Sequence, residues 1–422
     1  MKKICVLGLG YIGLPTALLF ANSDTKVVGV DIKEKVIESL KKGKTHFEEK
    51  GLQEQLDNAI KAKNFIVSSD VEESDVFIVC VPTPLDKETH YANLDLVANA
   101  CNMIAPYLRK GNIVIIESTI SPGSSEGLFK KTLEKSGLKS GKDFHFAYCP
   151  ERAIPGNTLF EMTNNVRIIG ALTHKGAKLA KKLYLKIVSG DKIFLTDIKT
   201  AEVVKLLENT YRDLNIALAN EFATLSEELK INVWEAIKLA NYHPRVDILK
   251  PGPGVGGHCL AIDPWFLIES SFNAQIVQMA RKINNNMPSY VILLTKQLIG
   301  DYKEFPTITV FGVAYKGNIG DTRETPAKKF IKLAKNIGWK IKLYDPLCKD
   351  FDYGELLNLE EAVRDSDSIV VLTDHDVFKD LDPQEIGNLV RKKNILDARN
   401  ILDHKKWEDA GFKIKILGNN KT

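Results

Sequence analysis

Residues 4–31 of this 422-residue chain read ICVLGLGYIGLPTALLFANSDTKVVGVD. An apolar run suited to a buried strand ends at the turn Gly8-x-Gly10-x-x-Gly13, a helical stretch follows, and the next strand ends at Asp31. Glycines at these positions allow a tight turn and bring a pyrophosphate close to a helix N-terminus, while the acidic residue can bind an adenosine ribose. Because a carboxylate repels a 2′-phosphate, the stretch predicts a strand-helix-strand unit that binds NAD rather than NADP.

The composition is that of a globular protein, with 44% hydrophobic and 27% charged residues. The net charge is only +4, from 58 basic and 54 acidic residues, and the lysines are scattered, which argues against a nucleic-acid partner. A chain of this length is expected to form two or three domains.

The amino end has the outline of a secretory signal, since two lysines precede an apolar run. The glycine spacing and the lack of a small-residue cleavage site argue against export, and no other apolar run is long enough to span a bilayer. Six cysteines at irregular spacing, without a C-x-x-C pair, favour reduced thiols and no zinc. We therefore expect a cytoplasmic protein with no membrane partner and no bound metal.

Short β-branched runs alternate with helical stretches in the first third of the chain and again after Thr307. This alternation is typical of parallel strands joined by crossover helices. Strands are predicted at 4–7, 26–30, 64–67, 76–81, 113–116, 144–148, 308–312, 340–344 and 368–372, and helices at 196–230, 233–241, 274–285 and 326–336.

The helical pattern at 196–230 is apolar on too many faces for a solvated helix, which predicts a buried spine or a subunit interface. The predicted fold is α/β, with two Rossmann-like doubly wound lobes joined by a central all-helical domain. The predicted domains are 1–195, an NAD-binding lobe; 196–300, the helical centre with a role in dimerisation; and 301–422, a C-terminal α/β lobe.

The sequence PGPGVGGHC at 251–259 surrounds the thiol of Cys259 with glycines, and Asp263 lies four positions further on. Glycines let the backbone approach a ligand closely and leave a core cysteine little to pack against, so we interpret Cys259 as a nucleophile. His258 or a nearby lysine could lower its pKa. Three other cysteines, Cys5, Cys80 and Cys101, lie in apolar or helical stretches and are interpreted as small buried hydrophobic residues.

Other polar residues stand where ligands bind in open α/β sheets. Thr83 and Thr119 follow strand ends, where cofactor contact and ordinary turn chemistry are equally possible. Glu151 and Arg152 follow the sixth strand, and Lys205, Asn209 and Arg212 are spaced to share one helix face.

In order along the chain, these motifs resemble the UDP-glucose/GDP-mannose dehydrogenase family. The resemblance covers the opening glycine turn, Cys149-Pro-Glu-Arg152, Lys205-x-x-x-Asn209, the loop of Cys259 with Asp263, and Tyr315-Lys-x-x-x-x-Asp-x-Arg323-Glu-x-Pro326. It implies oxidation of the C6 alcohol of a UDP-sugar to a carboxylate with two NAD.

Within the family, the run Asn241-x-His243-Pro-Arg245-Val and the Pro-Gly-Pro-Gly loop resemble the subfamily that acts on UDP-N-acetyl-D-mannosamine. UDP-N-acetylglucosamine and UDP-glucose remain alternative substrates, although UDP-glucose enzymes typically carry a tyrosine where this chain has Val255.

The resemblance also implies roles for individual residues. Cys259 would form a thiohemiacetal and then a thioester, Lys205 and Asn209 would act at the C6 oxygen, and Asp263 with Glu151 would activate water. The implied cofactor residues are Gly8, Gly10, Ile12, Gly13, Asp31, Lys35, Thr83, Thr119 and Arg323. The implied substrate residues are Arg152, Ala153, Lys205, Asn209, Arg212, His243, Arg245, Gly256, Tyr315 and Lys316.

The sequence does not decide whether Tyr315, Lys316 and Arg323 contact the UDP-sugar or the cofactor. The family likeness places His243 and Arg245 in the site of a neighbouring subunit, in a homodimer or a higher homo-oligomer.

Two other classes of function remain possible. A single-step hydroxyacid dehydrogenase would need no thiol, and a non-catalytic nucleotide-sugar sensor would need no reactive groups at all. The number of NADH formed per sugar, two, one or none, separates the three.

Overall fold

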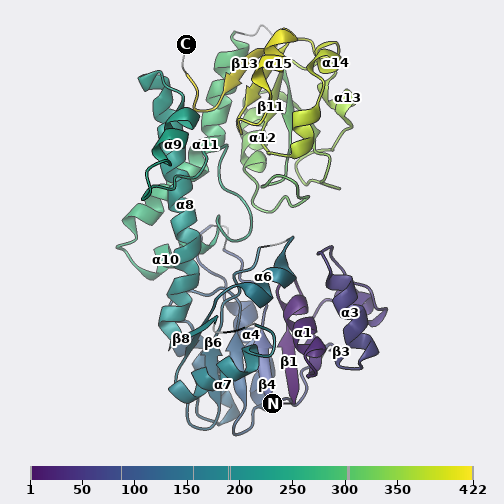
Figure 1. The fold of residues 1–422 in the computed structure, drawn as a ribbon, viewed down its shortest axis with the longest axis vertical. Helices are drawn as coiled ribbons and strands as arrows, with labels where there is room; N and C mark the ends of the chain where they lie inside the picture. Colours follow the sequence, from purple (N-terminus) through teal and green to yellow (C-terminus); the bar gives the residue numbers. More distant parts are fainter. Residues whose placement is uncertain are drawn as a thin grey trace. The chain divides into compact units, whose positions relative to one another are not determined.

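A computed structural model describes residues 2–86, 88–154, 156–188, 190, 192–301 and 305–420 (Figure 1). The chain divides into two compact units. Unit 1 comprises Met1–Glu208 with Trp265–Ser271, and unit 2 comprises Asn209–Pro264 with Phe272–Thr422. The predicted domain boundaries at 195 and 300 differ from this division and stay a prediction.

Unit 1 is built on an eight-stranded sheet with the order β3-β2-β1-β4-β5-β6-β7-β8. All neighbouring strands are parallel except β6 and β7, which are antiparallel. The elements are β1 (Lys3–Leu7), α1 (Gly13–Asn22), β2 (Lys26–Val30), α2 (Glu34–Lys41), α3 (Leu52–Lys61), β3 (Phe65–Ser68), β4 (Val76–Val79), α4 (Asp95–Ile104), η1 (Ala105–Tyr107), β5 (Ile113–Ile116), η2 (Ser125–Phe129), α5 (Lys130–Leu133), η3 (Glu134–Ser136), β6 (His145–Tyr148), α6 (Thr158–Asn164), β7 (Arg167–Ala171), α7 (His174–Tyr184) and β8 (Ile193–Asp197).

The central strands β4 and β5 of unit 1 are apolar and buried throughout because both faces of the sheet are covered there. In β1, Ile4 and Val6 pack into one core together with residues of α1 and α7, and Cys5 and Leu7 pack into the other with residues of α4. Cys5 and Cys101 are therefore buried, as the sequence predicts. Cys80 packs against the first of these cores, and its thiol also donates a hydrogen bond of 3.2 Å to Glu117 Oε2, which the sequence did not predict.

Helices then dominate until residue 299: α8 (Ile198–Leu229), α9 (Val233–Ala240), α10 (Asp263–Ser270) and α11 (Gln275–Ile299). The 32 residues of α8 give a helix of about 48 Å, at a rise of 1.5 Å per residue. In unit 2, the second half of α8 packs with α9 and α11 against the sheet that follows, through Ala223, Ile237 and Val291 among others.

The sheet of unit 2 has five parallel strands in the order β10-β9-β11-β12-β13. Its elements are β9 (Thr307–Phe311), α12 (Pro326–Asn336), β10 (Lys340–Tyr344), α13 (Leu359–Val363), β11 (Ser368–Val371), η4 (Asp376–Asp380), α14 (Pro383–Gly387), β12 (Asn394–Asp397), α15 (His404–Asp409) and β13 (Lys413–Ile416). The predicted architecture, two Rossmann-like lobes with a helical region between them in sequence, is confirmed. No helix in the described part of the chain has the length and apolar character that crossing a membrane requires.

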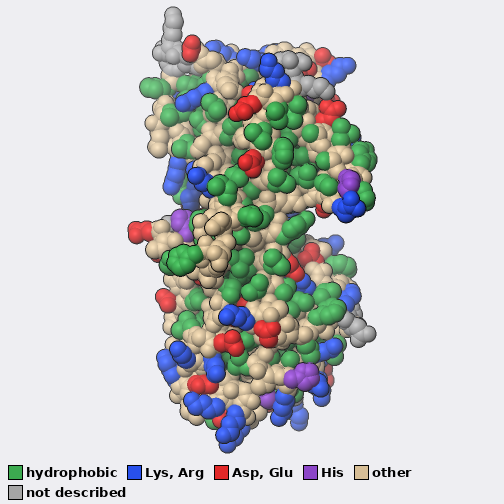
Figure 2. Space-filling model, turned by 90° about the vertical axis from the view of Figure 1, so that its left-hand side faces the viewer, with side chains coloured by type: hydrophobic (Ala, Val, Ile, Leu, Met, Phe, Trp, Pro, Cys, Tyr) green, Lys and Arg blue, Asp and Glu red, His purple; other side chains and the backbone are tan. Residues whose placement is uncertain are grey.

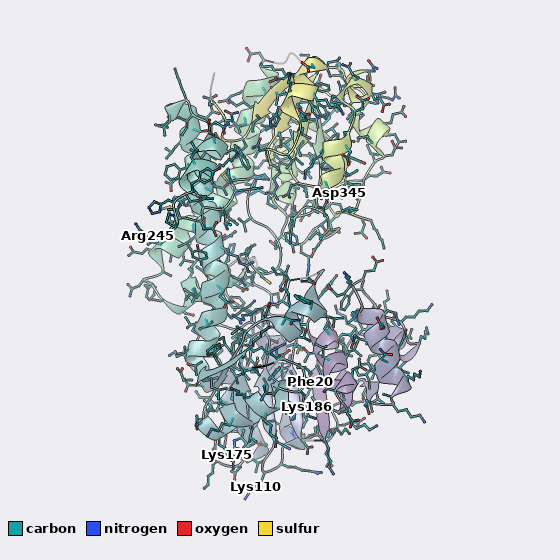
Figure 3. The ribbon with its side chains drawn as sticks, viewed as in Figure 1. Phe20, Lys110, Lys175, Lys186, Arg245 and Asp345 are labelled. Atoms are coloured by element: carbon teal, nitrogen blue, oxygen red, sulfur yellow. The ribbon has the colours of Figure 1, made fainter. Side chains whose placement is uncertain are left out.

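Asp345 directly follows β10 (Figure 3) and holds two loops of unit 2 together. Its carboxylate accepts the backbone N–H groups of Val313 and Ala314 at Oδ2 and those of Leu347 and Cys348 at Oδ1, and the His375 ring bonds Oδ2 at 3.1 Å. Burial alone would raise the pKa of this carboxyl, but the His375 ring and the backbone donors hold it well below its usual range.

We expect Asp345→Asn to lower the free energy of unfolding by about 3 kcal/mol, because buried backbone donors lose their acceptor. Since the folded-state pKa is depressed, the contribution is complete above the unfolded-state pKa of about 4 and is lost as the pH falls further. Thermal unfolding between pH 3 and 7 measures both effects. Asp350→Asn, at an exposed carboxylate nearby, is the control; equal effects of the two variants would contradict the prediction.

Candidate active site

In the turn after β1, the fold requires a glycine at position 13 but leaves room for a side chain at position 10. A Cβ atom on Gly13 would lie 1.7 Å from the carbonyl oxygen of Gly8, which itself has a φ of +88°. A Cβ on Gly10 would meet no atom within 4 Å. The N-cap residue of α1, Ile12, makes no side-chain hydrogen bond to the first turn of the helix. The turn therefore fits a pyrophosphate at the helix N-terminus.

Asp31 is fixed beside this turn by two backbone donors. Its Oδ2 accepts the N–H of Leu9 and its Oδ1 accepts the N–H of Lys33, each at 2.9 Å. Lys35 is exposed in the first turn of α2, and Ile12 is half-buried. A carboxylate held at the end of β2 fits the ribose of a dinucleotide, so the residues of unit 1 fit NAD.

Two carboxylates that the sequence analysis missed hold the loops after β4 and β5. Glu269 of α10 accepts the N–H of Ala92 at 2.8 Å and the hydroxyl of Ser121. Glu202 of α8, which is fully buried, accepts the N–H groups of Gly123 and Ser125. They fix the loops that carry Thr83, which is buried, and Thr119, which is half-buried.

Glu151 is buried directly after β6. Its Oε1 accepts the N–H groups of Arg152 and Ala153 at 2.6 and 2.8 Å, and its Oε2 accepts Nη2 of Arg167 at 2.7 Å. The guanidinium of Arg152 forms an ion pair with Glu208 on α8. The structure therefore orients the Glu151 carboxylate through three donors, of which the arginine was not predicted.

On α8 in unit 2, Asn209 joins two other predicted residues. Its Nδ2 donates to Asp263 Oδ2 at 2.5 Å, and its Oδ1 accepts from Arg212. Asp263 is buried as the first residue of α10, where the positive end of the helix dipole favours a negative charge. Lys205, one turn earlier on α8, is also buried.

The loop that carries Cys259 is anchored at three points in unit 2. The N–H of Gly252 donates to Asn220 of α8, Arg281 of α11 donates to the carbonyl of Leu260, and the N–H of Gly257 donates to the carbonyl of Arg323. The thiol of Cys259 stays exposed, and the carbonyl of the same residue accepts the N–H of Asp263 at 2.8 Å.

Paired glycines let this loop lie against Tyr315 and Glu324. A Cβ on Gly256 would be 2.6 Å from the carbonyl oxygen of Glu324, and one on Gly257 would be 2.7 Å from the Tyr315 ring. The prediction that His258 or a nearby lysine lowers the pKa of Cys259 stays a prediction. Burial, followed by the nearby Arg323 guanidinium, lowers the pKa of His258, which disfavours the charged form of its ring.

Tyr315 and Lys316 lie in the loop after β9, beside the point where the strand order of unit 2 reverses. Ligands bind at such points in open α/β sheets. The carboxylate of Asp374 accepts the N–H of Gly317 and Nη2 of Arg399. Arg323 forms an ion pair of 2.6 Å with Asp321.

His243 and Arg245 lie apart from these groups on an exposed loop of unit 2. The N–H of Arg245 donates to Nδ1 of His243 at 3.3 Å. Arg245 projects at the edge of the ribbon in Figure 3. The structure leaves both side chains turned to the outside of unit 2.

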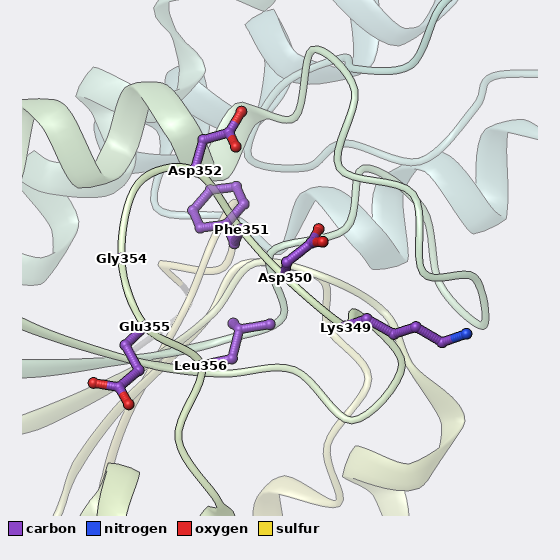
Figure 4. Close-up of a pocket in the computed structure, with 7 residues that line it drawn as sticks. All are labelled: Lys349, Asp350, Phe351, Asp352, Gly354, Glu355 and Leu356. Carbon is purple, nitrogen blue, oxygen red and sulfur yellow. The ribbon is translucent and has the colours of Figure 1, made fainter. Parts of the chain in front are cut away.

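A surface hollow of about 490 Å³ is lined by the loop after β10 (Figure 4). Its lining, Lys349, Asp350, Phe351, Asp352, Gly354, Glu355 and Leu356, includes none of the predicted site residues. In the described ranges, no group of three His, Cys, Asp or Glu side chains is arranged to hold a metal ion.

Family models match the chain in three segments: the NAD binding domain at residues 2–188, the central domain at 199–286 and the UDP binding domain at 309–404. The chain belongs to the UDP-glucose/GDP-mannose dehydrogenase family. It is 47% identical to the UDP-N-acetyl-D-mannosamine dehydrogenase of Methanococcus aeolicus, over 100% of this chain and 96% of the relative. Identity to the enzyme of that name from Methanocaldococcus jannaschii is 48%, over 100% and 97%.

A solved structure of UDP-D-ManNAc dehydrogenase from Pyrococcus horikoshii matches with a TM-score of 0.94 and 41% identity, over 100% of both chains. The resemblance inferred from the motifs is therefore confirmed. The protein is an NAD-dependent UDP-sugar dehydrogenase.

A substitution of Gly10 can test cofactor binding in this dehydrogenase without disturbing its fold. We expect Gly10→Ala to leave thermal stability unchanged, because the new methyl group meets no protein atom. The methyl group would occupy the space of the pyrophosphate, so NADH binding should weaken tenfold or more, which corresponds to about 1.4 kcal/mol. Fluorescence titration with NADH measures the affinity. Gly127→Ala, at another glycine with open space around its Cβ position, is the matched control. Wild-type affinity of the Gly10 variant would refute the assignment.

Proposed function

We propose that this dehydrogenase converts UDP-N-acetyl-D-mannosamine to UDP-N-acetyl-D-mannosaminuronate through a thioester on Cys259. The observation that carries the proposal is an exposed cysteine on an anchored glycine loop, whose backbone carbonyl accepts the N–H of Asp263, the hydrogen-bond partner of Asn209. The choice of sugar is supported by the names of the two archaeal relatives and by the His243-Pro-Arg245 loop.

Bound NAD supplies the hydride acceptor for both oxidations at C6. Overall, one alcohol, one water and two NAD⁺ give one carboxylate, two NADH and three protons. Cys259 adds to the intermediate aldehyde through its sulfur, so the aldehyde need not leave between the two oxidations. After the second oxidation the product is a thioester. Water then attacks the acyl carbon, the C–S bond breaks, and the thiol is regenerated.

The other side chains are assigned by their chemistry. Lys205 stabilises or exchanges a proton with the C6 oxygen, and the second N–H of the Asn209 amide donates to the developing oxyanion. Asp263 and Glu151 take protons from the attacking water. We assign UDP-sugar binding to Arg152, Ala153, Arg212, His243, Arg245, Gly256, Tyr315 and Lys316.

A panel of UDP-sugars with NAD tests the function. We expect UDP-N-acetyl-D-mannosamine to give the highest kcat/KM and two NADH per sugar consumed, counted by absorbance against uronate formed. One NADH per sugar would favour a single-step dehydrogenase and none a sensor. A higher kcat/KM with UDP-N-acetylglucosamine or UDP-glucose would overturn the choice of sugar.

We also propose a cytoplasmic homodimer with shared active sites. The sequence of α8 predicts a spine or an interface, and five apolar side chains on it, Tyr211, Leu218, Phe222, Leu225 and Leu229, are between 36% and 60% exposed. Their spacings of seven, four, three and four put them on one face of the helix. Figure 2 shows hydrophobic side chains gathered along the side of unit 2 that carries α8 and α9. The reduced thiol that the mechanism needs favours a cytoplasmic location.

If two subunits share each active site, two defective variants should restore activity when they are mixed. Cys259→Ser alone should stop turnover, because a serine ester is harder to form and cleave, and Arg245→Ala alone should weaken UDP-sugar binding by about ten- to hundredfold while sparing NAD. Mixing the two variants should restore part of the activity, since one site of a mixed dimer receives both intact residues. Steady-state NADH formation after subunit exchange measures this. Inactive mixtures with proven exchange would place Arg245 in the site of its own subunit.

A further inference from the structure

Arg167, the first residue of β7, is a charged side chain in the core of unit 1 that the mechanism above does not use. Its side chain is only 4% exposed. Burial of a charge is costly unless ion pairs and hydrogen bonds compensate it. Here Nη2 donates to Glu151 Oε2 at 2.7 Å and to the carbonyl of Met162 at 3.2 Å, and the guanidinium lies over the Tyr184 ring at 4.8 Å.

A second carboxylate, Glu117, lies on the other side of the guanidinium, with Oε1 3.8 Å from Arg167 Nη1. Glu117 is itself held by Tyr184, whose hydroxyl donates to Oε1 at 2.5 Å, and by Thr16 and Cys80, which donate to Oε2. Burial raises the pKa of Glu117, and Arg167 opposes this shift. The guanidinium is therefore held between two buried carboxylates and over an aromatic ring, which leaves it little freedom to move.

The bonds from the described residues leave Glu151 one acceptor position. A carboxylate offers about four lone-pair sites. The two backbone N–H groups of Arg152 and Ala153 occupy Oε1, and Arg167 occupies one site on Oε2. The remaining site is on Oε2, the same oxygen that Arg167 binds, so the position of Arg167 determines the direction in which Glu151 can accept a proton from water.

We propose that Arg167 is a positioning residue that directs Glu151 toward the water that hydrolyses the Cys259 thioester. This role rests on the function proposed above. In the step, water adds to the acyl carbon, one of its protons moves to Glu151 Oε2, the C–S bond breaks, and the electron pair leaves with the sulfur of Cys259. Arg167 gives up no proton and touches no substrate.

The test compares full-length Arg167→Lys and Arg167→Gln with the wild type, using UDP-sugar and NAD. A lysine keeps the charge but cannot present a fork of donors, and a glutamine loses the charge. Both variants should still release two NADH per site in a first rapid phase and then stall, because oxidation does not need the positioned water. We expect kcat to fall about tenfold for lysine and a hundredfold for glutamine, within the range for loss of general-base assistance.

The stalled enzyme should carry an acyl group on Cys259, seen by intact-protein mass spectrometry as the added mass of the UDP-uronoyl group. Hydroxylamine should restore NADH formation, since it attacks the acyl carbon without help from a base and releases the sugar as a hydroxamate. A variant with a merely damaged fold would gain nothing from hydroxylamine. NADH titration verifies that the cofactor site is intact.

Tyr184→Phe is the matched control, because it removes the hydroxyl bond to Glu117 and keeps the ring under Arg167. It should lower stability without accumulating the acyl-enzyme. If Arg167→Gln does not fold, the lysine variant decides. Arg167 variants that lose activity with no acyl-enzyme and no rescue, or that turn over like the wild type, would overturn the positioning role. A wild-type enzyme that forms fewer than two NADH per sugar would instead overturn the proposed function, and the role of Arg167 with it.

Discussion

Backbone N–H groups that lose their partners where a parallel strand ends must find other acceptors, and this constraint shapes several loops at the strand ends of both units. Buried and half-buried carboxylates supply acceptors in several of these loops. Asp31 holds the loops after β1 and β2, and Glu202 and Glu269 hold the loops after β4 and β5. In unit 2, Asp345 does the same for the loops after β9 and β10. These loops are therefore ordered by carboxylates that accept their backbone N–H groups.

Much of the fold could be predicted because the buried strands are short, apolar and separated by helical patterns. The predicted bounds of β2, β5, β10 and α12 agree with the structure. The edge strands β8 and β13 were missed, because half-buried strands such as KIKI at 413–416 lack an apolar run. The strand β7 was missed as well, and its antiparallel pairing with β6 leaves no mark in local periodicity.

Only those residues of the candidate site that belong to short sequence motifs could be predicted. Glycine turns and the cysteine loop are local, so their positions are readable from the sequence. The side chains that hold these motifs in place come from distant parts of the sequence. Arg281 donates to the carbonyl of Leu260 and to Asp213, which lies 68 positions before it in the sequence. Arg167 of β7 donates to Glu151, which follows β6. A charged residue in an apolar segment is the one signal that could have drawn attention to them.

The two hydrogen bonds of Asp31 bear on how cofactor preference can change in this dehydrogenase. Asp31 is both the residue proposed to bind the ribose and the acceptor that holds the glycine turn through the N–H of Leu9. A substitution that admits a 2′-phosphate removes a repulsive charge and also a structural acceptor. Redesign toward NADP therefore favours serine or asparagine, which keep an oxygen at this position, over alanine, and a basic residue to bind the added phosphate must come from a neighbouring position.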